Sequence, residues 1–256
     1  MYKYSLRGKK MNTKRIQYKI NMDRFELMEH GPINIVFFGD SITAGGFEGD
    51  TSDKDAAYPA KLVRKIRDLR DFVHVNSINY AVGGFMAHES TERFLTQVMP
   101  IEPTLMIICF GLNDINDTKE KFLGALHTMF AACKEKDIDT IFMTPNMMNT
   151  YVAEGTAERH LSYAAKTAKV QTDGTMDDYI YSAIDLAHEM GITVCDCYSK
   201  WKELAKTEDT TLLLANRINH PIREMHDLFA GSLFETIFGK EAVKVAENDG
   251  TMYIEK

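Results

Sequence analysis

Cysteine is scarce in this chain: four of its 256 residues are cysteines, and no pair has the Cys-x-x-Cys spacing of many zinc and redox sites. Cys109 and Cys195 lie in apolar runs, and Cys133 ends an apolar stripe of helical spacing. Cys197 follows Cys195 at an interval of two residues. Buried free thiols are the expected state, so the sequence argues against a disulfide framework and against a zinc site.

Long apolar runs are absent as well. None approaches the roughly 20 residues of a membrane-spanning helix, and no apolar stretch follows the N-terminal charges as a secretory signal requires. The first 22 residues carry no acidic side chain and these basic ones: Lys3, Arg7, Lys9, Lys10, Lys14, Arg15 and Lys19. We therefore expect a solvated basic extension over residues 1–30, or a start at a later methionine, and a cytoplasmic protein without a membrane partner.

Positive charge is in deficit over the whole chain, with 30 basic against 37 acidic side chains and a formal net charge of -7. This balance argues against a general nucleic-acid binder and suits an enzyme with a neutral substrate. The length and the 45% hydrophobic content fit one globular domain, which we place at residues 31–240, followed by a C-terminal tail at 241–256. Self-association is left open.

Several cofactor motifs are missing. The stretch 39–46 holds three glycines but lacks the Gly-Lys-Ser/Thr of a phosphate-binding loop and the Gly-x-Gly-x-x-Gly of a dinucleotide site. The Gly-x-Ser-x-Gly elbow of α/β-hydrolases is also absent, as is any His, Cys and carboxylate cluster with metal-ligand spacing. We expect no cofactor and no metal.

The chain does contain five short apolar runs that alternate with amphipathic stretches. The runs lie at 33–38, 72–78, 105–110, 140–143 and 192–195. The clearest helical stripe between them consists of Phe122, Leu126, Met129, Phe130 and Cys133. Alternating strands and helices predict a three-layer α/β/α fold with a mostly parallel five-stranded sheet covered on both faces.

One connection is too long for a simple loop. Residues 146–176 follow the carboxyl end of the fourth predicted strand, and they contain a plausible helix at 158–170. The insertion should therefore project over the edge of the sheet where open α/β sheets bind ligands. A surface excursion and a lid that shapes the substrate site are both compatible with this pattern.

The tripeptide Gly39-Asp40-Ser41 directly follows the first apolar run, so Ser41 should lie at the carboxyl edge of the sheet. By itself the tripeptide is also compatible with an ordinary turn. Three later segments add to it: residues 79–84 (Asn-Tyr-Ala-Val-Gly-Gly) and 111–114 (Gly-Leu-Asn-Asp) each follow another apolar run, and 219–221 (Asn-His-Pro) precede a helical pattern.

In this order the four segments resemble the SGNH hydrolases, also called the GDSL esterase/lipase family, which are named for one Ser, Gly, Asn and His in these blocks. The matching residues here are Ser41, Gly84, Asn113 and His220, and the resemblance spans about residues 33–238. It implies a flavodoxin-like fold and a serine nucleophile. The N–H groups of Ser41 and Gly84 and the amide of Asn113 are then the candidate oxyanion hole, although Gly84 also fits a plain turn and Asn113 a helix start.

A serine nucleophile needs a base, and the chain has eight histidines. We select His220, because Pro221 suits the first turn of a helix and the family's base occupies that context. His88, which follows the Gly83-Gly84 loop, and His226 are the alternatives that the sequence does not dismiss.

The sequence departs from the family where the orienting acid is expected, because Arg217 stands three residues before His220. Asn216, Asn219 or a backbone carbonyl could orient the imidazole instead. A remote carboxylate could also substitute, with Asp196 as one candidate, or the protein could be weakened or inactive.

We favour a Ser–His dyad supported by a carbonyl or an amide, with Asp40 bracing the nucleophile loop. The resulting hypothesis is a serine esterase for small acyl esters, chiefly acetyl, on carbohydrates, acting through an acyl-serine intermediate. An acyltransferase and a catalytically weakened binding protein of the same fold are the alternatives. The expected partner is a small-molecule or oligosaccharide ester.

Overall fold

The computed structural model describes residues 13–49, 51–69 and 73–239. The predicted C-terminal tail at 241–256 and the first part of the basic extension therefore lie outside the described residues. In the part of the chain that is described, every helix is too short or too polar to cross a membrane.

A five-stranded parallel sheet forms the centre of the molecule, with strand order β2-β1-β3-β4-β5. The strands are β1 (Ile33–Gly39), β2 (Val75–Asn79), β3 (Leu105–Cys109), β4 (Asp139–Met143) and β5 (Thr193–Cys195). Each neighbouring pair is parallel, and β1 pairs with both β2 and β3. This order is the flavodoxin-like arrangement, so the predicted fold class is confirmed.

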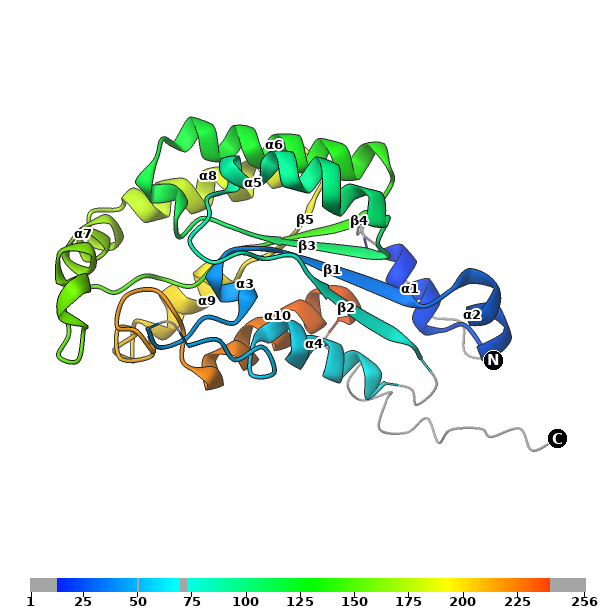
Figure 1. Ribbon diagram of the computed structural model, residues 1–256, viewed down its shortest axis with the longest axis horizontal. Helices are drawn as coiled ribbons and strands as arrows, with labels where there is room; N and C mark the ends of the chain where they lie inside the picture. The colour runs from blue at the N-terminus through cyan, green and yellow to red at the C-terminus, as the bar shows by residue number, and fades with distance from the viewer. Residues whose placement is uncertain (1–12, 50, 70–72, 240–256) are drawn as a thin grey trace.

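Helices cover both faces of this sheet (Figure 1). One face carries α5 (Ala87–Arg93), α6 (Lys119–Glu135) and α8 (Thr175–Glu189), and the other carries α4 (Tyr58–Arg67), α9 (Cys197–Leu204) and α10 (His226–Phe238). The predicted stripe on α6 is buried, from Phe122 to Cys133, because it faces the sheet. The short helix α3 (Ser41–Ala44) begins directly after β1.

The segment at 13–30 forms two helices, α1 (Lys14–Ile20) and α2 (Arg24–His30). Ile16 and Ile20 lie one turn apart on α1 and are buried, and the N–H of Arg15 donates to Asp139 Oδ2 at 2.6 Å. The expectation of a solvated tail therefore does not hold for α1. The basic side chains masked an apolar i, i+4 pair that anchors this helix to the body.

A glycine lies where the carboxyl ends of β1 and β3 pair. Gly39 pairs with Cys109, and a β-carbon on Gly39 would lie 2.5 Å from both the Cys109 carbonyl oxygen and Thr43 Oγ1. Any larger residue would force these elements apart. This close approach sets the position of the loop that starts at Asp40.

Candidate active site

Ser41 and His220 meet at the carboxyl edge of the sheet. Ser41 is the first residue of α3, and its Oγ lies 2.9 Å from His220 Nε2. Of the two alternative histidines, His226 is fully buried and its Nδ1 accepts from the Tyr58 N–H, whereas His88 lies 3.5 Å from Asp117. Among the described residues, His220 is thus the histidine within hydrogen-bond reach of Ser41.

The acceptor for the other ring nitrogen of His220 is a main-chain carbonyl. His220 Nδ1 lies 2.8 Å from the carbonyl oxygen of Phe47. A carbonyl can only accept, so Nδ1 carries the hydrogen and the lone pair of Nε2 faces the Ser41 hydroxyl. Burial lowers the pKa of His220 from its usual 6.5, and the hydrogen bond to Phe47 acts more weakly in the opposite direction. The imidazole is therefore neutral at pH 7 and able to accept a proton.

The two asparagines near His220 order its loop, and the ring nitrogens of His220 hydrogen-bond to Phe47 and Ser41 instead. Asn216 Oδ1 accepts from the N–H groups of Ile218, Asn219 and His220, and Asn216 Nδ2 donates to Asn219 Oδ1 at 2.9 Å. Arg217 adopts a left-handed conformation with φ of 60° and donates to the carbonyl oxygens of its own turn.

Asp196 is occupied elsewhere. It caps α9, with Oδ1 accepting from the N–H of Ser199 at 2.9 Å and from Thr144 Oγ1 at 3.1 Å. In the described part of the chain, its recorded contacts do not include His220. A remote carboxylate at this position, one of the three arrangements that the sequence left open, therefore does not orient the base in this structure.

Asp40 braces the nucleophile loop from below. Its Oδ1 accepts from the N–H of Ile42 at 3.0 Å and caps α3, while its buried Oδ2 has no hydrogen-bond partner among the described residues. Burial raises the pKa of this carboxyl from 3.8 to about 7. A neutral or half-titrated carboxyl behind Ser41 contributes no full negative charge to the site at neutral pH.

The loop with Gly83 and Gly84 passes directly beside the nucleophile. A β-carbon on Gly83 would lie 3.5 Å from Ser41 Cβ, and Gly84 has a φ of 82°, a conformation that favours glycine. Asn113 approaches the same loop, since its Nδ2 donates to the carbonyl oxygen of Phe85 at 3.2 Å. The structure thus brings the four motif residues Ser41, Gly84, Asn113 and His220 to one edge of the sheet.

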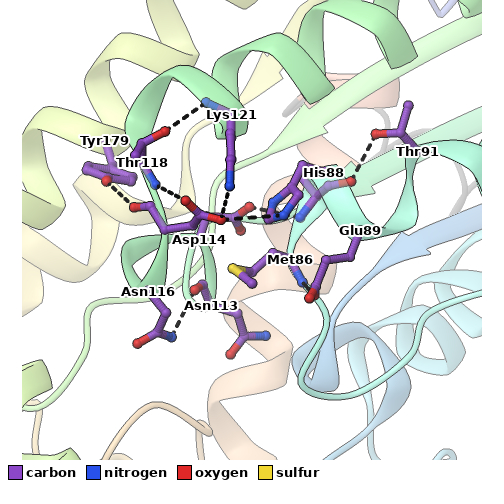
Figure 2. A network of polar contacts seen from close by, with 12 residues as sticks. Met86, His88, Glu89, Thr91, Asn113, Asp114, Asn116, Thr118, Lys121 and Tyr179 are labelled. Atoms are coloured by element: carbon purple, nitrogen blue, oxygen red, sulfur yellow. Dashed lines mark hydrogen bonds and ion pairs between the residues drawn. The ribbon is translucent and has the colours of Figure 1, made fainter.

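Asp114 joins the start of α5 to the turn that carries Asn113, and Figure 2 shows it among the polar groups of this region. Its Oδ1 accepts from the Ala87 N–H at 2.8 Å and its Oδ2 from the Gly111 N–H at 2.9 Å. Burial raises the pKa of this carboxyl to about 6. Asp114 therefore has a structural task, and it holds the Gly84 loop against the Asn113 turn.

The insertion at 146–176 touches both sides of the site. It contains α7 (Leu161–Thr172), from which Lys166 Nζ donates to Asn116 Oδ1 at 2.6 Å, close to Asn113 in sequence. At its start, Asn146 Nδ2 donates to the carbonyl oxygen of Asn219 at 2.9 Å, beside His220. The insertion thus connects the Asn113 turn with the His220 loop, and Figure 1 shows α7 at one end of the molecule.

Sequence reasoning missed two residues of this site. Phe47 contributes a main-chain oxygen, for which no side-chain pattern exists. Gly46 lies against both reacting residues, because a β-carbon there would be 3.2 Å from His220 Cε1 and 3.3 Å from Ser41 Cβ. Its only signal was membership of the glycine-rich stretch after the first strand. In the described residues no group of three His, Cys, Asp or Glu side chains could hold a metal ion.

The sequence profile of the GDSL-like Lipase/Acylhydrolase family matches residues 37–228, a range that includes all four motif residues. No curated protein matches the sequence.

Solved structures share the fold. A variant of the acetyl-xylooligosaccharide esterase Axe2 from Geobacillus stearothermophilus superposes with a TM-score of 0.62 at 21% identity, over 80% of this chain and 94% of that chain. LAE5, an α/β hydrolase from the metagenome of Lake Arreo, Spain, has a TM-score of 0.62 at 17% identity, over 81% and 95%. A GDSL-like lipase from Parabacteroides merdae has a TM-score of 0.61 at 18% identity, over 81% and 96%.

Proposed function

Because this chain belongs to the GDSL-like lipase/acylhydrolase family and is an ester hydrolase, we propose that it cleaves small acyl esters through an acyl-Ser41 intermediate. The observation that carries the proposal is the line of contacts from Ser41 Oγ to His220 Nε2 at 2.9 Å and from His220 Nδ1 to the Phe47 carbonyl at 2.8 Å. Burial keeps the imidazole neutral, and these contacts direct its free lone pair to the hydroxyl that would attack.

In the first half-reaction, Ser41 Oγ bonds to the ester carbonyl carbon while its proton passes to His220 Nε2. The carbonyl oxygen becomes an oxyanion, for which the N–H groups of Ser41 and Gly84 and the Asn113 amide are the proposed donors. The carbon–oxygen bond to the alcohol then breaks, and the alcohol leaves with the proton from His220. In the second half-reaction a water gives a proton to His220 while its oxygen bonds to the acyl carbon. The bond from that carbon to Ser41 Oγ then breaks, the acid is released, and His220 returns the proton to Ser41 Oγ.

We propose an acetyl ester of a carbohydrate as the substrate class. The fold shared with the acetyl-xylooligosaccharide esterase supports this assignment. The insertion at 146–176 offers polar groups at the rim, among them Tyr163 and Lys166, which contact Asn116 beside the Asn113 turn. In this proposal the insertion shapes the pocket for the sugar. p-Nitrophenyl acetate should therefore be cleaved faster than the octanoyl ester, and a rate that rises with acyl length would contradict the assignment.

The nucleophile is tested by labelling with a fluorophosphonate and measuring the intact mass. Wild type and Ser77→Ala, which alters an exposed serine on β2, should each gain one phosphonyl group and hydrolyse p-nitrophenyl acetate. Ser41→Ala should do neither while keeping its melting temperature. Hydrolysis by Ser41→Ala would refute the proposal, and labelling without turnover would favour the acyltransferase or the weakened binding protein.

A further inference from the structure

The Phe47 carbonyl can assist His220 only if it is held in place, and the structure shows what holds it. Building on the proposed Ser41–His220 chemistry, we propose that Arg223 is a positioning residue that clamps Phe47 so that its carbonyl stays aligned with His220 Nδ1. Arg223 follows the base by three residues, at the start of the short helix Arg223–Met225. The segment 220–223 would then supply both the base, His220, and the residue that holds the Phe47 carbonyl in place, Arg223.

The guanidinium of Arg223 contacts three residues of the Phe47 loop. Its central carbon lies over the Phe47 ring, 4.4 Å from the centroid. Nη1 donates to Glu48 Oε1 at 2.7 Å, and Nε donates to Asp53 Oδ2 at 3.1 Å. A planar guanidinium can serve a ring and two carboxylates at once, whereas an ammonium cannot match this geometry.

Two further residues, Lys61 and His226, support Arg223 and Phe47. Lys61 of α4 donates to the carbonyl oxygen of Arg223 at 2.9 Å and pairs with Asp227 at 2.8 Å. The ring of His226 packs on Phe47 with centroids 4.9 Å apart, and its Nδ1 accepts from the Tyr58 N–H at 3.0 Å. The Phe47 side chain, which is fully buried, is therefore held by Arg223 and by His226.

The loop around Phe47 leaves its carbonyl available. The Gly46 N–H donates to the Ser41 carbonyl at 2.7 Å, the Phe47 N–H to Thr51 at 3.1 Å, and the Asp53 N–H to Gly45 at 2.8 Å. These bonds close the loop on itself and connect it to the nucleophile. The remaining freedom is the tilt of the Phe47 peptide, and the ring held by Arg223 restricts that tilt.

Alignment matters more for a carbonyl than for the carboxylate that it replaces. A carboxylate offers two oxygens and a full charge, whereas a carbonyl has one oxygen and no net charge. A small rotation of the Phe47 peptide would therefore release the hydrogen on Nδ1 and allow the wrong tautomer. Misplacement of about 1 Å in a catalytic arrangement can lower the rate on the order of 10²-fold.

The test compares Arg223→Met, Arg223→Lys and Phe47→Leu with wild type on p-nitrophenyl acetate. Phe47→Leu keeps the main-chain carbonyl and every charge but removes the ring under the guanidinium. Arg15→Met is the matched control, because it removes another arginine–aspartate pair, with Asp137, on the distant α1. Melting temperatures identify any variant that fails to fold. If Arg223→Met does not fold, the milder substitutions Arg223→Lys and Phe47→Leu still test the contact between the guanidinium and the ring.

We expect kcat to fall about 10- to 100-fold in Arg223→Met and Phe47→Leu, less in Arg223→Lys, with KM unchanged. NMR titration of the His220 ring supplies a second readout. In Phe47→Leu the pKa of His220 should fall further. The carbonyl of residue 47 is then misaligned, and it no longer stabilises the imidazolium through a hydrogen bond to Nδ1. Arg15→Met should match wild type.

Wild-type kcat in both folded variants would overturn the clamp. A rise in KM alone would also overturn it, since Arg223 would then contact substrate. An inactive Ser41→Ala measured alongside shows that the proposed function survives either result. An active Ser41→Ala would instead refute the proposed function itself, whatever the Arg223 variants do.

Discussion

Gly46 faces the imidazole of His220 so closely that a β-carbon would stand 3.2 Å from its Cε1 atom. The same atom would lie 3.3 Å from Ser41 Cβ, so a methyl group would press on the nucleophile and the base together. The backbone of Gly46 does not need positive φ, and alanine is therefore compatible with the local conformation. The constraint on this position comes from its two neighbours.

Gly46→Ala should fold normally and lose activity. We expect kcat to fall about 10- to 100-fold, because the hydrogen bond from Ser41 Oγ to His220 Nε2 has to lengthen or tilt. Gly124→Ala is the control: this glycine lies in α6 with open space at its β-carbon position, so alanine should stabilise the helix by about 0.5–1 kcal/mol without altering kcat. Unchanged turnover in Gly46→Ala would show that the pair tolerates the displacement.

Asn113→Ala should lower kcat by roughly 10²–10³ with little change in KM, since the amide is proposed to act on the oxyanion of the transition state. Asn76→Ala is the comparison, because it removes an exposed amide on β2 that donates to Asn34 Oδ1. Steady-state kinetics on p-nitrophenyl acetate separate the effect on kcat from the effect on KM. A change in KM alone would identify Asn113 as a binding or turn residue.

Asp196→Asn should retain most of the wild-type kcat, whereas His220→Ala should lose it. Asp196 caps α9, and an asparagine can still accept from the Ser199 N–H. Removing a genuine triad aspartate can cost on the order of 10⁴ in rate, so the assay discriminates easily. Equal losses in both folded variants would mean that a carboxylate reaches the base after all.

The acid limb of the pH–rate profile should lie below pH 6.5. Burial lowers the pKa of His220, so the imidazole stays neutral, and able to accept the Ser41 proton, at a pH where an exposed histidine would already be protonated. Activity is thus expected to be full at neutral pH and to disappear only as the pH falls through this lowered pKa. kcat/KM measured in overlapping buffers checks the position, and a midpoint above 6.5 would contradict it.

Asp40→Asn should gain stability relative to wild type as the pH rises. The pKa of Asp40 is about 7 in the folded protein and near 3.8 when exposed, so the folded state binds more protons between these values. Stability from this group is present below about pH 4 and lost as the pH rises through 7. Asparagine removes that loss, on the order of 1–4 kcal/mol, while still accepting from Ile42. Urea unfolding at acidic and alkaline pH, with exposed Asp185→Asn as control, measures the difference.

The apolar runs were sufficient to predict the parallel sheet. The four motif residues came from the resemblance to the SGNH hydrolases, and the runs placed Ser41 and Asn113 at the same edge. His220 could be selected over His226 by its place before Pro221. Phe47 could not be predicted, because a main-chain oxygen leaves no trace in residue identity. Arg223 was equally hidden: its contacts with Glu48 and Asp53 join segments about 170 residues apart, which no local pattern reports.

The acceptor of His220 Nδ1 is a backbone atom, so mutagenesis cannot remove it. Every amino acid placed at position 47 brings the same carbonyl oxygen, so no codon change there deletes the acceptor of His220 Nδ1. Substitutions at position 47 would therefore report on the ring that holds the peptide in place, and none of them would remove the oxygen itself. Semisynthesis that replaces the peptide linkage after Phe47 with an ester, a weaker acceptor, would expose it. The oxygen also carries no titratable proton, so this part of the site is the same in acid and in base.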